Sequence, residues 1–170
     1  MEFYSRDLKN TDIDRLNELY ALPEVTQYQT WGPQSYEETQ QFINMVLDKD
    51  SNWIYNVLVD PDTDKVIGTI QLAIDEVNQS AEINFIVHPN HWSNGVATDI
   101  AKTIIKYAFK VLKLNRIWAS IDSSNIAAGI VLEKLGMKRE GILRQDKLVQ
   151  DTYRDTYRDT LIYGFLRSEY

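Results

Sequence analysis

The sequence predicts one mixed domain of the α/β (α+β) class, in which about four helices flank a twisted, mostly antiparallel sheet of roughly six to seven strands. Short alternating apolar segments joined by turns indicate hairpins. In contrast, segment 82–109 passes from a strand through a polar loop into a long amphipathic helix, and another strand follows at 114–121. Because a whole helix separates these two strands, we expect them to be parallel, with a right-handed crossover.

Capping residues and apolar periodicity define the elements of the first half. Thr11 and Asp14 are typical of a helix start, and Ser35 with Glu38 three residues later forms a capping box. An aromatic, turn-rich segment at 28–33 separates the two helices. The expected bounds are about 11–23 and 35–48 for the helices, and 53–59, 66–74 and 81–87 for the strands.

The second half begins with the long helix, where apolar residues recur at helical spacing over 96–112. A strand at 114–121 follows it. Asn125 is a favourable N-cap for a helix over 126–135, and Gly136 is expected to end that helix.

A terminal antiparallel hairpin is expected from strands at 143–149 and 160–166. Between them, Thr152-Tyr-Arg-Asp is followed at once by Thr156-Tyr-Arg-Asp. Two copies of four residues are too short for a repeat architecture, so we expect both to lie in a charged turn. The protein is expected to be a monomer or, through this hairpin, a homodimer.

Composition narrows the possible functions. The 170 residues, 44% of them hydrophobic, are enough for one domain (1–170) with a sizeable core. The net charge of −7 argues against nucleic-acid binding and is compatible with an amine substrate, although acidity alone also serves solubility. No apolar stretch approaches the roughly 20 residues of a membrane span, so we expect no membrane partner and a cytoplasmic location.

The absence of cysteine constrains the chemistry. It excludes disulfides, thiolate zinc sites and any cysteine-linked covalent intermediate. Any acyl transfer would therefore most simply go directly from a thioester to the acceptor.

The loop before the long helix is a candidate binding site. It consists of Trp92, Ser93, Asn94, Gly95, Val96, Ala97 and Thr98. The first N–H groups of a helix lack intrahelical acceptors and attract anions. Gly95 allows a bulky ligand to approach the main chain, and Ala97 keeps the first turn narrow. These features indicate a diphosphate site, with an ordinary strand-to-helix connection as the alternative. The two common glycine-rich phosphate motifs are absent from the sequence.

This loop resembles the coenzyme A loop of the GNAT acetyltransferase superfamily, Gln/Arg-x-x-Gly-x-Gly/Ala, with Gly95 and Ala97 at its two small positions. Trp92 stands in the first position, as is common in the RimJ/RimL branch, which acetylates protein N-termini. The stretch from Asn125 to Met137, followed by a Glu-Gly pair and Arg144, is similar to the asparagine-led helix of the same branch. Together with a run ending at Tyr163, the matches span about 53–163, with a weaker one at 31–42.

The resemblance implies acetyl-CoA as co-substrate, bound in a sheet whose two central parallel strands are splayed apart. It implies that main-chain groups of Phe85, Ile86 and Val87 pair with pantetheine, that residues 93–98 hold the diphosphate, and that the Asn125 side chain holds pantetheine. A main-chain N–H near Val87 is also suited to stabilise negative charge on the thioester oxygen.

The catalytic groups follow less directly. Acetylation needs a neutral amine, and Glu82 is the leading candidate for the base that takes its proton. The alternatives are that Glu82 pairs with a lysine or binds a cationic acceptor. Trp31 is a candidate for the acceptor site, with packing over the core as the alternative. Many family members use a tyrosine in the helix after the asparagine as general acid, and some carry a serine three residues after the asparagine. The matching residues in this chain are Leu132 and Ala128. The thiolate would therefore leave with the help of solvent, of Tyr163 or of another aromatic hydroxyl.

These observations predict an N-acetyltransferase acting on a protein N-terminus or a small amine. Polyamine acetylation is a related alternative, and a non-catalytic acyl-CoA sensor is a distinct one. His88 and His91 lie near the loop, but they have no carboxylate at ligand spacing. We therefore expect no metal site and two exposed loop residues.

Overall fold

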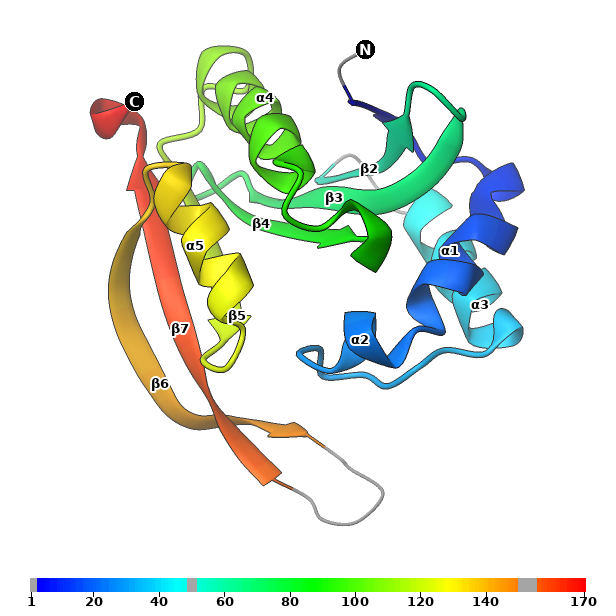
Figure 1. Ribbon diagram of the computed structural model, residues 1–170. Helices are drawn as coiled ribbons and strands as arrows, with labels where there is room; N and C mark the ends of the chain where they lie inside the picture. The colour runs from blue at the N-terminus through cyan, green and yellow to red at the C-terminus, as the bar shows by residue number, and fades with distance from the viewer. Residues whose placement is uncertain (1–2, 49–51, 150–155) are drawn as a thin grey trace.

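The computed structural model describes residues 3–48, 52–149 and 156–170, and within them seven strands form one sheet in the order β1-β2-β3-β4-β5-β7-β6 (Figure 1). The strands are β1 (Tyr4–Asp7), β2 (Trp53–Asp60), β3 (Lys65–Asp75), β4 (Ser80–Val87), β5 (Arg116–Asp122), β6 (Lys138–Val149) and β7 (Thr156–Leu166). The helices of this described part are α1 (Ile13–Tyr20), α2 (Pro23–Thr26), α3 (Tyr36–Leu47), α4 (Val96–Lys110) and α5 (Ile126–Lys134), with 3-10 turns η1 (Asn10–Asp12), η2 (Pro89–His91) and η3 (Arg167–Glu169). None of these helices is both long and apolar enough to cross a membrane.

Helices pack on both faces of the sheet and give two buried clusters. On one face, α4 and α5 lie side by side (Figure 1), and Ile105, Phe109 and Leu132 pack against Ile83 and Ile117 of the central strands. The alternation of apolar residues along β4 and along α4 produces this face.

The opposite face is covered by α1 and α3. Leu16 and Ile43 from these helices pack with Tyr55 and Val57 of β2, and all four side chains are buried. The sheet therefore separates a side covered by α4 and α5 from a side covered by α1 and α3.

The central strands β4 and β5 are parallel, whereas every other strand pair is antiparallel. Their pairing covers only Ser80–Glu82 against Arg116–Trp118. Beyond this point β4 continues to Val87 and β5 to Asp122 without pairing to each other. The predicted mixed sheet with a splayed parallel pair is confirmed, and the split opens directly after Glu82.

The predicted helix caps of α3 and α5 are confirmed. In the capping box of α3, the Glu38 N–H donates to Ser35 Oγ (3.3 Å) and the Ser35 N–H donates to Glu38 Oε2 (2.7 Å). At the end of α5, Gly136 has a φ of 88°, and the Met137 N–H donates to the Leu132 carbonyl (3.1 Å). Only glycine adopts this left-handed conformation at low cost, which explains its position after the helix.

Two N-terminal elements were not predicted. Strand β1 pairs with β2 from Tyr4 opposite Val59 onward, and α2 is a helix of four residues. Both are short, and the polar β1 lacks the periodicity by which strands are recognised. The first long helix also starts later than expected, because η1 precedes Ile13 and Thr11 lies within that turn.

The terminal hairpin is longer than predicted. Strand β6 is exposed along most of its length, so burial does not impose an alternating pattern on it. The expectation that both repeats lie in a turn is wrong for the second copy, because Thr156 already begins β7 and pairs with Val149. The first copy, 152–155, lies outside the described residues.

Candidate active site

Helix α4 begins with main-chain donors that have no protein acceptor. Gly95 is its N-cap, with φ 80° and ψ −6°, and no side chain caps the helix. The N–H groups of Val96, Ala97 and Thr98 have no hydrogen-bond partner among the described residues, and the first bond runs from the Asp99 N–H to the Gly95 carbonyl (3.0 Å). Three adjacent free donors at the positive end of a fifteen-residue helix are suited to bind an anion.

The indole of Trp92 attaches this loop to the end of β4. Its Nε1–H donates to the Val87 carbonyl (2.6 Å), while the side chain remains 46% exposed. Ser93, which follows it, has a φ of 63° and turns the chain toward Gly95. The indole bond therefore fixes the distance between the open end of β4 and the start of α4.

A cavity of about 80 Å³ lies in the split between β4 and β5. Its lining consists of Tyr28, Gln29, Ile83, Asn84, Phe85, Ala119, Ser120, Ile121, Asp122, Asn125, Ala128 and Leu132. Helix α5 contributes Ala128 and Leu132 on one face of the sheet, whereas Tyr28 and Gln29 approach from the other face. The split therefore connects the side of α4 and α5 with the side of α1 and α3.

Asn125 lies at this split and caps α5. Its Oδ1 accepts the Ala128 N–H (3.1 Å), which confirms the predicted N-cap. Its Nδ2 group has no hydrogen-bond partner among the described residues. One side chain therefore satisfies the helix start and still offers a donor to a ligand in the cavity.

Glu82 is located at the vertex of the split, since its pair with Trp118 is the last one between β4 and β5. The Ser120 hydroxyl donates to Glu82 Oε1 (2.6 Å). The second oxygen has no partner, and Glu82 makes no ion pair, in the described part of the chain. The lysine pairing considered as an alternative role is thus not present there, and Oε2 is available to accept a proton.

The strand stretch Phe85–Val87 pairs with β3 on one side only. Gly68 lies opposite Val87, and a Cβ at this glycine would be 2.3 Å from the Ile86 carbonyl oxygen. Such a distance is impossible without moving the main chain, so Gly68 allows β3 and β4 to approach closely here. Gly68 was not predicted from the sequence to shape the site, although a glycine inside a strand pattern is a known signal of close backbone approach.

Two further candidates are engaged elsewhere. The Tyr163 hydroxyl donates to Glu133 Oε1 (3.3 Å), and burial together with the Glu133 charge raises the pKa of this phenol. Tyr163 does not line the cavity in the split. Trp31 packs edge-on against Tyr20, with ring centroids 5.3 Å apart, over the cluster between α1, α3 and β2.

The two histidines beside the loop are half-buried, so the expectation that they are exposed is wrong. His88 Nδ1 accepts the Asn90 N–H (3.2 Å), and the His91 ring packs edge-on against Phe3. Burial and the neighbouring His91 lower the pKa of His88. Among the described residues, no group of three or more potential ligand side chains could hold a metal ion.

Several residues at the split were not identified from the sequence. They are Tyr28, Gln29, Asn84, Ser120 and Asp122. Ser120 and Asp122 alternate with the apolar residues of β5, a signal that could have placed them on the face of Glu82. The approach of Tyr28 and Gln29 depends on tertiary packing, for which the local sequence carries no signal.

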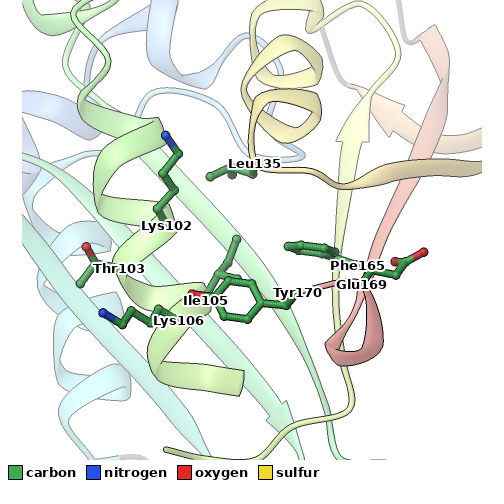
Figure 2. A pocket seen from close by; sticks show the side chains of 8 residues that line it. All are labelled: Lys102, Thr103, Ile105, Lys106, Leu135, Phe165, Glu169 and Tyr170. Carbon is green, nitrogen blue, oxygen red and sulfur yellow. The ribbon is translucent and has the colours of Figure 1, made fainter. Parts of the chain in front are cut away.

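A larger hollow of about 400 Å³ lies away from the split, between α4 and the C-terminal segment (Figure 2). Lys102 and Lys106 lie on one side of it, and Phe165, Glu169 and Tyr170 lie on the other (Figure 2). None of the candidate catalytic or coenzyme-binding residues lines it. Asn125 and Ser120, whose hydroxyl contacts Glu82, line the split instead.

Residues 4–138 match the family described as "Acetyltransferase (GNAT) domain", and the chain belongs to this family. Among its relatives is YoaA of Bacillus subtilis (strain 168), named an uncharacterized N-acetyltransferase, which is 32% identical over 146 residues covering 82% of this chain and 81% of that protein. The spermidine N(1)-acetyltransferase of Escherichia coli (strain K12) is 27% identical over 155 residues, covering 88% and 80%.

A solved structure gives the same fold. The spermidine N-acetyltransferase from Vibrio cholerae, crystallised in complex with CoA and spermine, matches with a TM-score of 0.86 at 24% identity, covering 99% of this chain and 97% of that chain. With the family match and the named relatives, the protein is an acetyl-CoA-dependent acetyltransferase of the GNAT type.

Proposed function

We propose that the protein transfers the acetyl group of acetyl-CoA directly to a primary amine, and that the split is the reaction site. The observation that carries this proposal is that β4 and β5 separate directly after Glu82 and Trp118. The opening joins the face with the free α4 donors to the face of the Glu82 carboxylate. A coenzyme on one face can therefore meet an amine that enters from the other.

On the coenzyme side, residues 93–98 hold the diphosphate through their main-chain N–H groups. The Nδ2 group of Asn125 and the main chain of Phe85–Val87 hold the pantetheine arm. The unpaired N–H groups of Val96, Ala97 and Thr98 and the free Nδ2 support these roles.

On the acceptor side, Glu82 acts as the general base. It accepts a proton from the ammonium form of the acceptor, and the neutral amine then attacks the thioester carbon. The C–N bond forms, the C–S bond breaks, and the coenzyme thiolate leaves. The nitrogen releases its remaining excess proton and the thiolate takes up one, so that an amide and a free thiol result. Tyr163 remains the candidate acid, with solvent as the alternative. Tyr28 and Ser120 also carry hydroxyl groups and line the split.

We infer that the acceptor is a small-molecule amine, and polyamines are the first to test. The spermidine acetyltransferases among the relatives support this choice. A single free carboxylate at the vertex of the split suits an ammonium group. The RimJ/RimL type of reaction, on a protein N-terminus, is the alternative, and Trp31 is proposed to contact the acceptor in either case.

Release of coenzyme thiol from acetyl-CoA tests the proposal, using a panel that contains spermidine, simple alkylamines and a short peptide with a free N-terminus. We expect thiol release with at least one small amine. Glu82→Gln should lower kcat about 100-fold and leave coenzyme affinity unchanged, since base catalysis contributes factors of this order. Glu76→Gln, at an exposed turn position, is the matched control. Coenzyme binding without thiol release from any amine would instead indicate an acyl-CoA sensor.

A further inference from the structure

Arg158, on β7, connects two parts of the chain that meet at the split. Its Nη1 group donates to the Gln27 carbonyl (2.7 Å) and to Asp122 Oδ2 (3.0 Å). Gln27 ends α2, and the next two residues, Tyr28 and Gln29, line the split. One guanidinium group therefore holds the segment 27–29 against the end of β5.

The carboxylate that Arg158 contacts is itself part of the site. The Asp122 side chain is only 6% exposed, and Arg158 is its ion-pair partner in the described chain. Its other oxygen accepts the Ser124 N–H (2.8 Å), and its carbonyl accepts the Asn125 N–H (2.9 Å). A buried carboxylate needs a partner that compensates its charge, and Arg158 is that partner for Asp122. By holding Asp122, Arg158 also fixes the turn that starts α5.

Arg158 lies on the acceptor side of the sheet. It shares a face of β7 with Thr160 and Ile162, which pair with Asp122 and Ser120 of β5. Ser120 contacts Glu82, so the same face carries the proposed base. The donors of α4 belong to the opposite side, and a change at Arg158 should therefore affect the acceptor before the coenzyme.

We propose that Arg158 is a positioning residue for the acceptor, which it affects through residues 27–29 and Asp122 without touching the reacting atoms. This inference rests on the proposed function, because it assumes that the amine enters from this side of the split. The Arg158 side chain is 30% exposed, so the connection lies at the rim of the site. Its loss should leave the wall formed by Tyr28 and Gln29 free to move away from β5.

Arg158→Met removes the donors and the charge but keeps the aliphatic stem. We expect the acceptor KM to rise about tenfold, in line with the sensitivity of substrate positioning to shifts of about 1 Å. The kcat at saturating acceptor and the coenzyme A affinity by calorimetry should both stay within about twofold of wild type. Arg158→Lys keeps the charge on a shorter side chain that cannot reach both oxygens equally well, so its KM should be intermediate, about threefold above wild type.

Arg144→Met is the matched control, since Arg144 is exposed on β6 and makes no hydrogen bond or ion pair with another described residue. It should have the wild-type KM. An unchanged KM in both Arg158 variants would overturn the proposal. So would a parallel loss of coenzyme affinity, which would indicate a general structural role.

Amide hydrogen exchange tests the same inference without turnover. The Gln27 and Gln29 amides donate locally to Pro23 and Thr26 and should exchange at least about tenfold faster in Arg158→Met than in Arg144→Met. If no amine is acetylated by the wild type, the proposed function fails, but this measurement still decides whether Arg158 holds the wall. Equal exchange rates would refute the positioning role. Should Arg158→Met not fold, Arg158→Lys is measured in the same way. Exchange rates and an acceptor KM equal to those of wild type in Arg158→Lys would then refute the positioning role.

Discussion

Helices α4 and α5 lie on the same face of the sheet (Figure 1), but their first turns are completed differently. The start of α5 is satisfied by its own Asn125 side chain, at 3.1 Å from the Ala128 nitrogen. The start of α4 follows a glycine with a left-handed main chain, and no side chain caps it. A helix start therefore keeps free donors for a ligand when the residue before it does not cap it.

The two starts also offer different chemistry. At α4 the donors are main-chain N–H groups reinforced by the dipole of a long helix, which suits a phosphate. At α5 the remaining donor is a single neutral amide group, which suits a carbonyl oxygen. We therefore propose that the diphosphate binds at the start of α4 and that Asn125, at the start of α5, binds the pantetheine arm.

The largest effect on coenzyme A affinity is expected from a negative charge at the start of α4. Gly95→Asp should weaken coenzyme A binding more than about 100-fold in calorimetry, which corresponds to about 2.7 kcal/mol. The added carboxylate would repel the diphosphate and would lie close to Asp99, whose Oδ2 is 3.7 Å from the position of the new Cβ. Gly95→Asn isolates the effect of the charge, because asparagine has nearly the same shape, tolerates a positive φ and can cap the helix like aspartate but carries no charge. Its affinity should lie between those of wild type and Gly95→Asp. Equal affinities of wild type and Gly95→Asp would contradict the assignment.

A smaller effect is expected from moving the strand that leads to α4. Gly68→Ala should lower coenzyme affinity about tenfold and reduce the free energy of unfolding by about 1–3 kcal/mol, because the new methyl group forces β3 away from Ile86. Gly32→Ala is the control, since nothing lies within 4 Å of its Cβ position. Calorimetry and thermal unfolding measure the two quantities. If Gly68→Ala binds like wild type, the position of Phe85–Val87 does not matter for the coenzyme.

The smallest effect on coenzyme affinity is expected at Asn125, where two substitutions distinguish its cap of α5 from its free Nδ2 donor. Asn125→Asp keeps an oxygen to cap α5 but loses the Nδ2 donor, so affinity should fall about fivefold, as expected for one hydrogen bond, with unchanged stability. Asn125→Ala should lose the same affinity and in addition about 1 kcal/mol of unfolding free energy, the usual contribution of an N-cap. Should the Asp variant bind coenzyme A like wild type, Nδ2 does not contact it.

The parts of the fold predicted from the sequence are those that local rules determine. The crossover from β4 through α4 to β5 was recognisable because a helix between two strands implies a parallel pair. The caps at Ser35 and Asn125 were recognisable because side-chain oxygens at helix starts have a direct local function. The GNAT family was recognised from the loop at Gly95 and the helix after Asn125, which the family match now confirms.

The parts that were missed depend on contacts between distant segments. Arg158 contacts a carbonyl 131 positions away, and no local pattern indicates such a pair. Exposed strands such as β6 carry little periodicity, so their bounds were predicted too short. The half-buried positions of His88 and His91 likewise depend on Phe3 and on the folded loop.

Both proposals about the coenzyme require that the free N–H groups at the start of α4 hold the diphosphate of coenzyme A. A crystal structure of the complex with coenzyme A tests it most directly. We expect diphosphate oxygens at hydrogen-bond distance, about 3 Å, from the nitrogens of Val96, Ala97 and Thr98. A coenzyme bound with its diphosphate elsewhere, while these three nitrogens face solvent, would contradict the account.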